Sequence, residues 1–279
     1  MALIFFFNII VWKGVFELNK STFLEVNFFD VGQGDSIFIE TPKRQQILID
    51  AGPGSIILEK LSKEMPFWDR TIDLIILTHP EKDHLAGLIE VLKSYTVENI
   101  LWTGVKRDTS EAREWEKLIK EEGAKIFIAR ADQKITWQEG EKNSIEVLYP
   151  FENFNGKVIE NSNNTSVVAK LIFGGISFLF TGDIQRAVEK ELTEKGGVLD
   201  SDVLKLAHHG SKTSSSEEFL GKVTPEIVVI QVGKDNQYGH PHQEVLERLK
   251  KYGIKVLRTD KDSDIKIISD SKNFKAQNL

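Results

Sequence analysis

All six histidines of this 279-residue chain lie in three short clusters. The clusters are residues 78–84 (THPEKDH), 207–211 (AHHGS) and 239–242 (GHPH). Histidine is the commonest protein ligand for transition metals, and a metal site needs several nitrogen and carboxylate ligands close together. Two carboxylates, Asp50 and Asp183, also follow hydrophobic runs, as the first two clusters do. The pattern therefore predicts a metal-dependent hydrolase.

The composition is that of an ordinary soluble protein, with 41% hydrophobic and 28% charged residues, and it allows a substantial core. The formal net charge of −6 argues against a protein that binds nucleic acid through a broad basic face. A nuclease with positive charge confined to its active site is compatible with it. The chain contains no cysteine, so nitrogen and oxygen atoms alone would bind a metal.

Residues 2–16 are almost wholly apolar, apart from Asn8 and Lys13. As a helix this segment would span about 22 Å, short of a hydrocarbon core of about 30 Å, and it lacks the features of a cleavable signal. Two interpretations stay open, a membrane-associated or anchoring helix and an extra hydrophobic element packed on the domain. We divide the chain into this segment (1–18), a hydrolase domain (19–270) and a polar, frayed tail (271–279).

From residue 23 onward, short β-rich runs alternate with helical patterns. The predicted strands cover residues 23–29, 36–40, 46–49, 73–77, 99–102, 125–128, 145–148, 166–173, 176–180, 203–206, 227–232, 255–257 and 265–268. The predicted helices cover residues 56–63, 83–93, 110–122, 184–194, 216–220 and 243–252. The order strand, strand, strand, helix, strand, helix occurs twice, the second time from residue 145. This repetition predicts an α/β fold in which two mixed β-sheets face each other with helices outside, a four-layer αββα sandwich.

The predicted strands position the candidate ligands. Strands that end at residues 77, 180 and 206 come just before His79, Asp183 and His208. Open α/β sheets commonly carry their sites at the carboxyl ends of strands, so these side chains are expected to converge. Asp83 and His84 open a helix with one apolar stripe, formed by Leu85, Leu88, Ile89 and Leu92.

These motifs resemble those of the metallo-β-lactamase superfamily, whose signature is His-x-His-x-Asp-His followed by a further His, an Asp and a last His. Within it, four segments closely resemble the hydrolase domain of the ComEC-type competence proteins, which move DNA across membranes. The segments are residues 29–36 (FDVGQGDS), 181–183 (TGD), 208–211 (HHGS) and 238–241 (YGHP). The resemblance spans residues 23 to about 270 and implies the αββα fold.

The resemblance also implies a set of metal ligands, with Asp183 as the bridge between two divalent ions, Mn²⁺ or Zn²⁺. The matching positions are His79, Asp83, His84, Asp183 and His208. Glu81 stands where the family has its second histidine, and it is either a weak ligand or a solvated loop carboxylate. The middle histidine is replaced by residues 162–166 (SNNTS), where Asn164 is either a ligand and substrate contact or an ordinary turn residue. One of the two ion sites would then be formed by His79 and Asp183, with Glu81 or Asn164 as a further ligand. This oxygen-rich site suits manganese or magnesium better than zinc.

The other expected roles surround these ligands. Two ions would lower the pKa of a bridging water and stabilise charge on a phosphate. Asp83 is expected to orient the hydroxide, and His240 to protonate the leaving oxygen or hold the phosphate. We place His209 on the substrate side or behind a ligand, because adjacent histidines seldom both bind one ion. Ser211 and Lys212 are the expected phosphate contacts, and Asp50 is expected to orient a ligand. Asp35 either supports the site in the same way or is only part of a glycine-rich tight turn.

Three functions are compatible with these residues. The first is a phosphodiesterase or nuclease acting on DNA, with RNA as a further substrate, membrane-associated or on the extracytoplasmic side. The second is a β-lactamase or small-ester hydrolase, although Glu81 and the missing histidine weaken the zinc site that such an enzyme needs. The third is a non-catalytic binding module of a DNA-uptake assembly, for which four retained ligands would be unnecessary. The sequence does not predict an oligomeric state.

Overall fold

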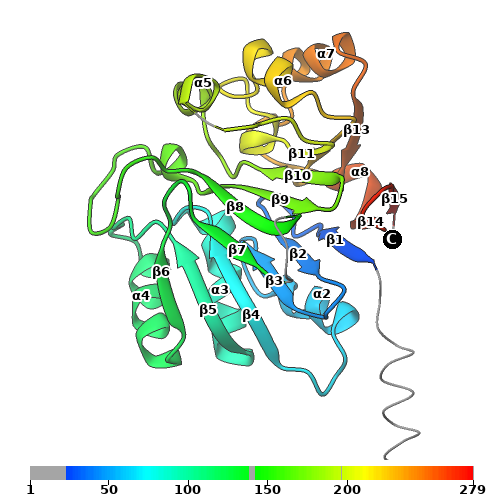
Figure 1. Cartoon of the computed structure of the whole chain (residues 1–279). Coiled ribbons are helices and arrows are strands. Elements are labelled where there is room, and N and C mark those ends of the chain that lie inside the picture. The colour runs from blue at the N-terminus through cyan, green and yellow to red at the C-terminus, as the bar shows by residue number, and fades with distance from the viewer. Residues whose placement is uncertain (1–22, 138–141, 196, 279) are drawn as a thin grey trace, which may run out of the picture.

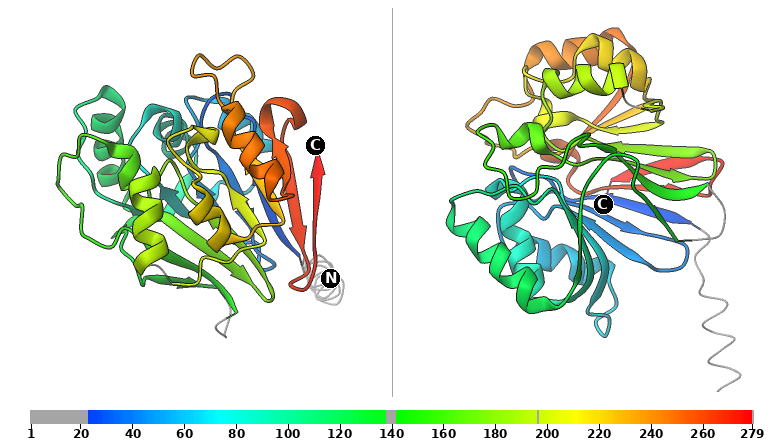
Figure 2. Two further views of the ribbon diagram at one scale, coloured as in Figure 1. Left: turned by 90° about the horizontal axis from the view of Figure 1, so that it is seen from above. Right: turned by 60° about the vertical axis from the view of Figure 1, so that its left-hand side comes forward.

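The computed structural model describes residues 23–137, 142–195 and 197–278, and Figure 1 shows their arrangement. Two β-sheets pack face to face. Helices α2 to α4 cover the outer face of one sheet, and helices α5 to α7 cover the outer face of the other (Figure 2). The predicted four-layer αββα sandwich is therefore confirmed.

Each half of the chain runs through three strands and then alternates helices with strands. The first half consists of β1 (Leu24–Phe28), β2 (Ile37–Glu40), β3 (Gln46–Ile49), α2 (Ile56–Glu64), β4 (Thr71–Leu77), α3 (Lys82–Ser94), β5 (Thr96–Trp102), α4 (Ser110–Glu122) and β6 (Lys125–Ile128). After β7 (Lys134–Thr136), the second half consists of β8 (Asn143–Tyr149), η1 (Ser162–Thr165), β9 (Val168–Phe173), β10 (Ile176–Phe180), α5 (Arg186–Lys195), β11 (Val203–Lys205), η2 (Ala207–Gly210), α6 (Glu217–Val223), β12 (Ile227–Ile230), α7 (Gln243–Lys251) and β13 (Lys255–Arg258). The chain closes with α8 (Thr259–Asp262), β14 (Ile265–Ser269) and β15 (Phe274–Asn278).

Within the described residues, the sheet of the first half has the strand order β15-β14-β1-β2-β3-β4-β5-β6, and the other has β13-β12-β11-β10-β9-β8-β7. Strands β3 to β6 are parallel to one another, and so are β10 to β13. The remaining pairs are antiparallel, so both sheets are mixed. Parallel strands end at the same edge of a sheet, and this edge carries the histidine clusters.

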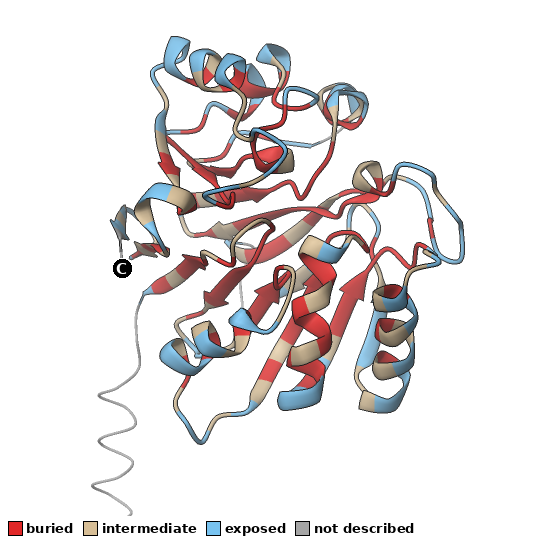
Figure 3. Cartoon of the chain, turned by 180° about the vertical axis from the view of Figure 1, so that it is seen from behind, coloured by how far each residue is buried: buried red, intermediate tan, exposed pale blue. Residues whose placement is uncertain are grey.

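Three apolar layers hold the sandwich together, and Figure 3 shows the strands as the most buried part of the molecule. The central layer lies between the sheets, where Phe28 of β1 meets Phe180 of β10 at 6.3 Å between ring centroids. The other two layers lie between each sheet and its helices. In α3 the predicted apolar stripe is buried against its sheet. The burial of this stripe fixes how α3 is rotated about its own axis, and so fixes the direction in which Asp83 and His84 project.

Two strands of the fold, β15 and β7, lie outside the predicted set. The polar tail was expected to be frayed, but β15 pairs antiparallel with β14 along its whole length. Phe274 and Ala276 pack against the central layer, so this short strand has one apolar face although most of its residues are polar. The short strand β7, which pairs with β8, was not predicted at all.

The apolar segment 2–16 lies outside the described residues. In the part of the chain that the structure describes, no helix is both long enough and apolar enough to cross a bilayer.

Candidate metal centre

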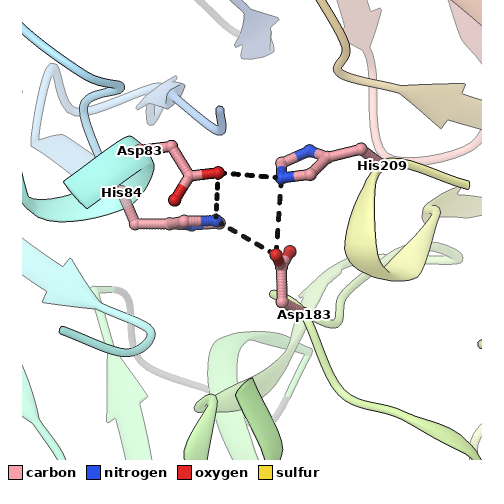
Figure 4. Close-up of side chains that lie close together, drawn as sticks. All are labelled: Asp83, His84, Asp183 and His209. Carbon is pink, nitrogen blue, oxygen red and sulfur yellow. Dashed lines mark ion pairs between the residues drawn. The ribbon is translucent and has the colours of Figure 1, made fainter. Parts of the chain in front are cut away.

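Four side chains converge where the two halves of the chain meet, as Figure 4 shows. Asp83 and His84 come from the first turn of α3, Asp183 from the loop after β10, and His209 from η2 after β11. Each offers one ligand atom, and these atoms all lie within 4.8 Å of one another. Nε2 of His209 is 3.4 Å from carboxylate oxygens of both Asp83 and Asp183, and Nε2 of His84 is 3.4 Å from Asp183. We call these residues the four-ligand group.

The four-ligand group leaves buried polar atoms without hydrogen bonds. Among the described residues, Nε2 of His84, Nε2 of His209 and Oδ1 of Asp183 are buried and make none. An unpaired buried polar group is costly, and it calls for a ligand or ion that the protein does not supply. Two imidazole nitrogens and two carboxylates facing one point are a donor set that suits zinc or manganese. The residues present therefore fit a divalent metal.

The charges of the four-ligand group shift its pKa values. Burial alone would lower the pKa of His84, but the carboxylates of Asp183, Asp50 and Asp83 raise it well above the usual value. The pKa of His209 is raised in the same way, mainly by Asp183 and Asp35. Burial raises the pKa of Asp183, yet His209 and His84 bring it well below its ordinary value. The carboxylates of Asp83 and Asp183 thus stay ionised and attract cationic charge, which a bound metal would supply in place of protons.

Asp50 orients the ring of His84 from the side away from the four-ligand group. Its Oδ2 lies 2.8 Å from Nδ1 of His84, and the same carboxylate accepts hydrogen bonds from the backbone nitrogen and the hydroxyl of Thr78 at 2.8 and 2.6 Å. Because Asp50 is an acceptor, Nδ1 carries a proton, and a metal bound by the four-ligand group would meet the lone pair of Nε2 in place of a second proton. Asp50 follows β3 directly, so the end of that strand fixes the tautomer of His84.

His209 is oriented by two acceptors. Its Nδ1 lies 2.8 Å from the carbonyl oxygen of Gln231 and 3.3 Å from Oδ1 of Asp35. The side chain of Gln231 is itself held, because its Nε2 donates to the carbonyl oxygens of Phe29 and Ser36. The motif 29–36 and the residue after β12 thus meet behind His209. They leave its Nε2 free to face the carboxylates.

The structure differs from the expectation for the second histidine cluster. His209, and not His208, occupies the position expected of the ligand. Both residues have φ of +53°, a left-handed conformation, and this turns the chain so that the second ring points inward. His208 lies on the more open side, where Nε2 is 3.3 Å from Nδ2 of Asn163 and Nδ1 is 3.3 Å from the hydroxyl of Thr213. A sequence pattern does not reveal a positive φ at a non-glycine residue, and hence cannot tell which of two adjacent rings turns inward.

His79 lies next to the four-ligand group without belonging to it. Its ring centroid is 4.2 Å from that of His84, and its Nδ1 faces the hydroxyls of Thr78 and Ser166 at 3.0 and 3.3 Å. Its Nε2 is buried and makes no hydrogen bond within the described residues. Burial and the charge of His84 lower the pKa of His79 to about 3, so the ring is neutral. A neutral imidazole with a free nitrogen is suited to a second ion.

Glu81 and Asn164 are engaged by other parts of the chain. The carboxylate of Glu81 forms an ion pair with Arg107 at 2.6 Å and accepts a hydrogen bond from the Ser162 hydroxyl. The side-chain oxygen of Asn164 accepts from the backbone nitrogen of Gln185 at 2.9 Å. Within the described residues, neither joins the four-ligand group, which argues against their predicted roles as ligands.

The expected substrate contacts lie on the loops around the four-ligand group. Ser211 is buried and its hydroxyl is 3.0 Å from that of Thr213, whereas Lys212 is exposed. The ring centroid of His240 lies 5.5 Å from that of His208 and 6.3 Å from that of His209. Burial and these two rings lower the pKa of His240 to about 4, so at neutral pH the ring is neutral and has no imidazolium proton to give. This favours holding the substrate over protonating a leaving group.

Lys205 is a buried residue of the site that sequence reasoning missed. It lies on β11, forms an ion pair with Asp35 and has its Nζ 3.7 Å from Oδ1 of Asp183. Its Nζ also donates to the carbonyl oxygen of Gly182 at 3.3 Å. The sequence does contain a sign of this buried ion pair. A lysine between Leu204 and Leu206 interrupts an apolar strand, and a buried lysine needs an acidic partner. Asp35, expected to orient a ligand, is that partner.

A family profile described as "Metallo-beta-lactamase superfamily" matches residues 29–234, which contain the four-ligand group. The chain belongs to this superfamily. The resemblance noted in the sequence is therefore confirmed by a match over most of the chain.

Curated relatives of the chain include proteins named for competence and for recombination. The chain is 33% identical to "ComE operon protein 3" of Bacillus subtilis over 86% of its length, and 33% identical to "Competence protein ComA" of Neisseria gonorrhoeae over 91%. It is 28% identical to "Recombination protein 2" of Haemophilus influenzae over 94%. The matched regions make up 32%, 33% and 30% of those proteins, so the chain spans about a third of their length.

Among solved structures, the chain is similar to a "CmlA beta-hydroxylase E377D mutant", with a TM-score of 0.54 and 13% identity. The similarity covers 92% of this chain and 54% of that one. At this identity it supports the fold and says nothing of the reaction.

Proposed function

We propose that this chain is a metal-dependent phosphodiesterase that cleaves DNA. One observation carries the proposal: Nε2 of His84 and Nε2 of His209 are buried, make no hydrogen bond within the described residues, and face the carboxylates of Asp83 and Asp183. When bound there, divalent ions would lower the pKa of water and stabilise negative charge on a phosphate. Zn²⁺ and Mn²⁺ both suit the donor set. His79 with Asp183 would supply part of a second site.

The protein side chains have separate roles in the proposed reaction. Asp83 has a side chain that is 33% exposed, whereas the other members of the four-ligand group are 4% exposed or less. Its carboxylate is thus the member that substrate and water reach, and it is placed to orient a water molecule and accept its proton. Asp50 and Gln231 hold the two imidazoles, so no ligand has to reorient during the reaction.

The choice of DNA rests on the relatives and on charge. One curated relative is named as a competence protein and another as a recombination protein, and both match over most of this chain. Lys212, close in sequence to His209, provides local positive charge on a chain of net charge −6. The ion pair between Glu81 and Arg107 removes that carboxylate from metal binding, which weakens the case for a lactamase-type zinc site.

Metal analysis and substrate trials test the proposal. The full chain is purified, its bound metals are counted, and it is offered single-stranded DNA, duplex DNA, RNA and a chromogenic lactam with Mn²⁺ or Zn²⁺. We expect DNA cleavage that is lost in Asp83→Ala while circular dichroism shows a folded protein. Asp108→Asn, which changes a side chain that is 96% exposed, is the matched control and keeps activity. Lactam turnover without DNA cleavage would contradict the proposal, as would metal binding without any turnover.

We further propose that residues 2–16 associate with a membrane, because their sequence is almost wholly apolar. Vesicle flotation of the full chain tests this independently of the reaction. A chain that stays with the soluble fraction at low and high salt would refute it.

A further inference from the structure

Tyr238 lies at the end of a row of aromatic rings that leads into the candidate metal centre. It stands on the loop between β12 and α7, and it is 57% exposed. Its ring stacks on that of His240, with 5.7 Å between centroids and 24° between planes. His240 in turn neighbours His209 of the four-ligand group, at 6.3 Å and 33°. The row therefore connects solvent to a ligand of the metal centre.

The loop that carries Tyr238 is held by hydrogen bonds of its own. Nδ2 of Asn236 donates to the carbonyl oxygens of Gly233 and His240 at 2.9 and 2.8 Å, and its Oδ1 accepts from the backbone nitrogen of His240 at 2.9 Å. The backbone nitrogen of Gly233 donates to Gln33 at 3.2 Å. A ring presented on a loop held in this way loses little conformational freedom when a ligand binds to it.

Packing of the fold does not account for this ring. Within the described residues, Tyr238 makes no hydrogen bond or ion pair, and its aromatic contact is with His240. A large aromatic side chain left more than half exposed beside an active site is suited to contact a ligand. Flat rings of this kind stack on nucleobases, and each stacked base is worth about 1–3 kcal/mol.

We propose that Tyr238 is a stacking platform for an unpaired base, which gives the site a preference for single-stranded over duplex DNA. The inference rests on the proposed function and names its substrate class. Bases in a duplex already stack on their neighbours and must be unstacked first, whereas a single strand offers its bases directly. Stacking also supplies affinity that an acidic chain cannot obtain from many phosphate contacts.

Binding and cleavage are measured separately to test the platform. Binding uses a fluorescein-labelled oligothymidylate of about 12 nucleotides in Ca²⁺, followed by anisotropy. For Tyr238→Ala we expect Kd to rise about tenfold, within the range for one stacked base, whereas Tyr238→Phe and Tyr238→Trp stay close to the wild type. Phe67→Ala is the matched control, because Phe67 is 82% exposed on the loop before β4, at the amino end of that strand.

Cleavage then separates stacking from an effect on His240. In Mn²⁺, Tyr238→Ala should lower kcat/KM for single-stranded DNA about tenfold more than for methyl p-nitrophenyl phosphate, which has no base. An equal fall in kcat/KM for both substrates would show that Tyr238 acts through His240 and would overturn the proposal. So would an unchanged Kd for the oligothymidylate. If the wild type cleaves no phosphodiester, the proposed function fails, but the change in Kd still decides whether Tyr238 binds a base.

Discussion

Nδ1 of His84 lies 2.8 Å from Oδ2 of Asp50, and neither side chain is exposed to solvent. The contact fixes the imidazole from the side away from the metal centre. It also links the end of β3 to the start of α3, since each residue stands at one of these points.

We expect Asp50→Asn to weaken metal binding, because an amide supports the ligand tautomer of His84 less well than a carboxylate does. Loss of such a contact typically costs about 10–100-fold in metal affinity. Titration calorimetry with Mn²⁺ and Zn²⁺ measures the change. Asp270→Asn, at a fully exposed carboxylate, is the control and should leave the affinity unchanged. An unchanged affinity in Asp50→Asn would mean that His84 is not a ligand or needs no support.

The two adjacent histidines should behave differently. We expect His209→Ala to reduce metal affinity by more than the roughly 100-fold that a supporting contact can cost, because it removes a member of the four-ligand group. His208→Ala should reduce it by less than about tenfold, since that ring contacts Asn163 and Thr213 instead. The same calorimetric titration compares the two variants. The reverse order of effects would show that the rings exchange places when metal binds.

Lys205→Met should destabilise the fold strongly. The substitution removes the lysine partner of the buried Asp35 carboxylate and leaves it only its contacts with histidines, and breaking a buried ion pair from one side costs about 3–5 kcal/mol. Urea denaturation measures the free energy of unfolding. The double variant Asp35→Asn with Lys205→Met has neither charge of this ion pair. We therefore expect it to regain part of the free energy of unfolding that Lys205→Met loses. A double variant as unstable as the sum of the single variants would show that the two residues do not interact.

Gly34→Ala should displace the first turn of α3. A Cβ at Gly34 would lie 2.1 Å from the carbonyl oxygen of Asp83, and the residue has φ of +136°. The backbone conformation alone costs about 1–3 kcal/mol for a residue with a side chain, so we expect a lower Tm together with weaker metal binding. Gly221→Ala on α6 is the control, because its Cβ meets no atom within 4 Å. Its Tm should stay equal or rise. Equal Tm values for Gly34→Ala and the wild type would contradict the close approach.

His240 makes stability depend on pH in the metal-free protein. Its pKa is lowered from 6.5 to about 4 in the folded chain, so between these values the unfolded chain binds more protons. Acidification from about pH 7 to pH 5 therefore lowers the free energy of unfolding, by about 1 kcal/mol for a partly exposed ring. His240→Asn should lose about 1 kcal/mol less than the wild type over this range. Urea denaturation with EDTA at both pH values checks this, and equal losses would refute it.

Much of the fold could be predicted because the apolar periodicity is strong where burial is complete. Strands such as β12 and helices such as α3 follow directly from it. The tail could not be predicted, because β15 has only a few apolar residues and owes its place to pairing with β14. The types and spacing of the residues in the four-ligand group identified them as candidates for metal binding or catalysis. The exchange of His208 for His209 and the role of Lys205 depend on backbone conformation and on partners distant in sequence, and these appear only in three dimensions.

The two halves of the chain each contribute two members of the four-ligand group, Asp83 and His84 from one and Asp183 and His209 from the other. A nascent polypeptide therefore has no competent centre until the ribosome has passed His209 and the second half has folded onto the first. Whatever bond this centre hydrolyses, a fragment released early during synthesis is inert. The layout thus delays assembly of the metal centre until translation of the domain is well advanced.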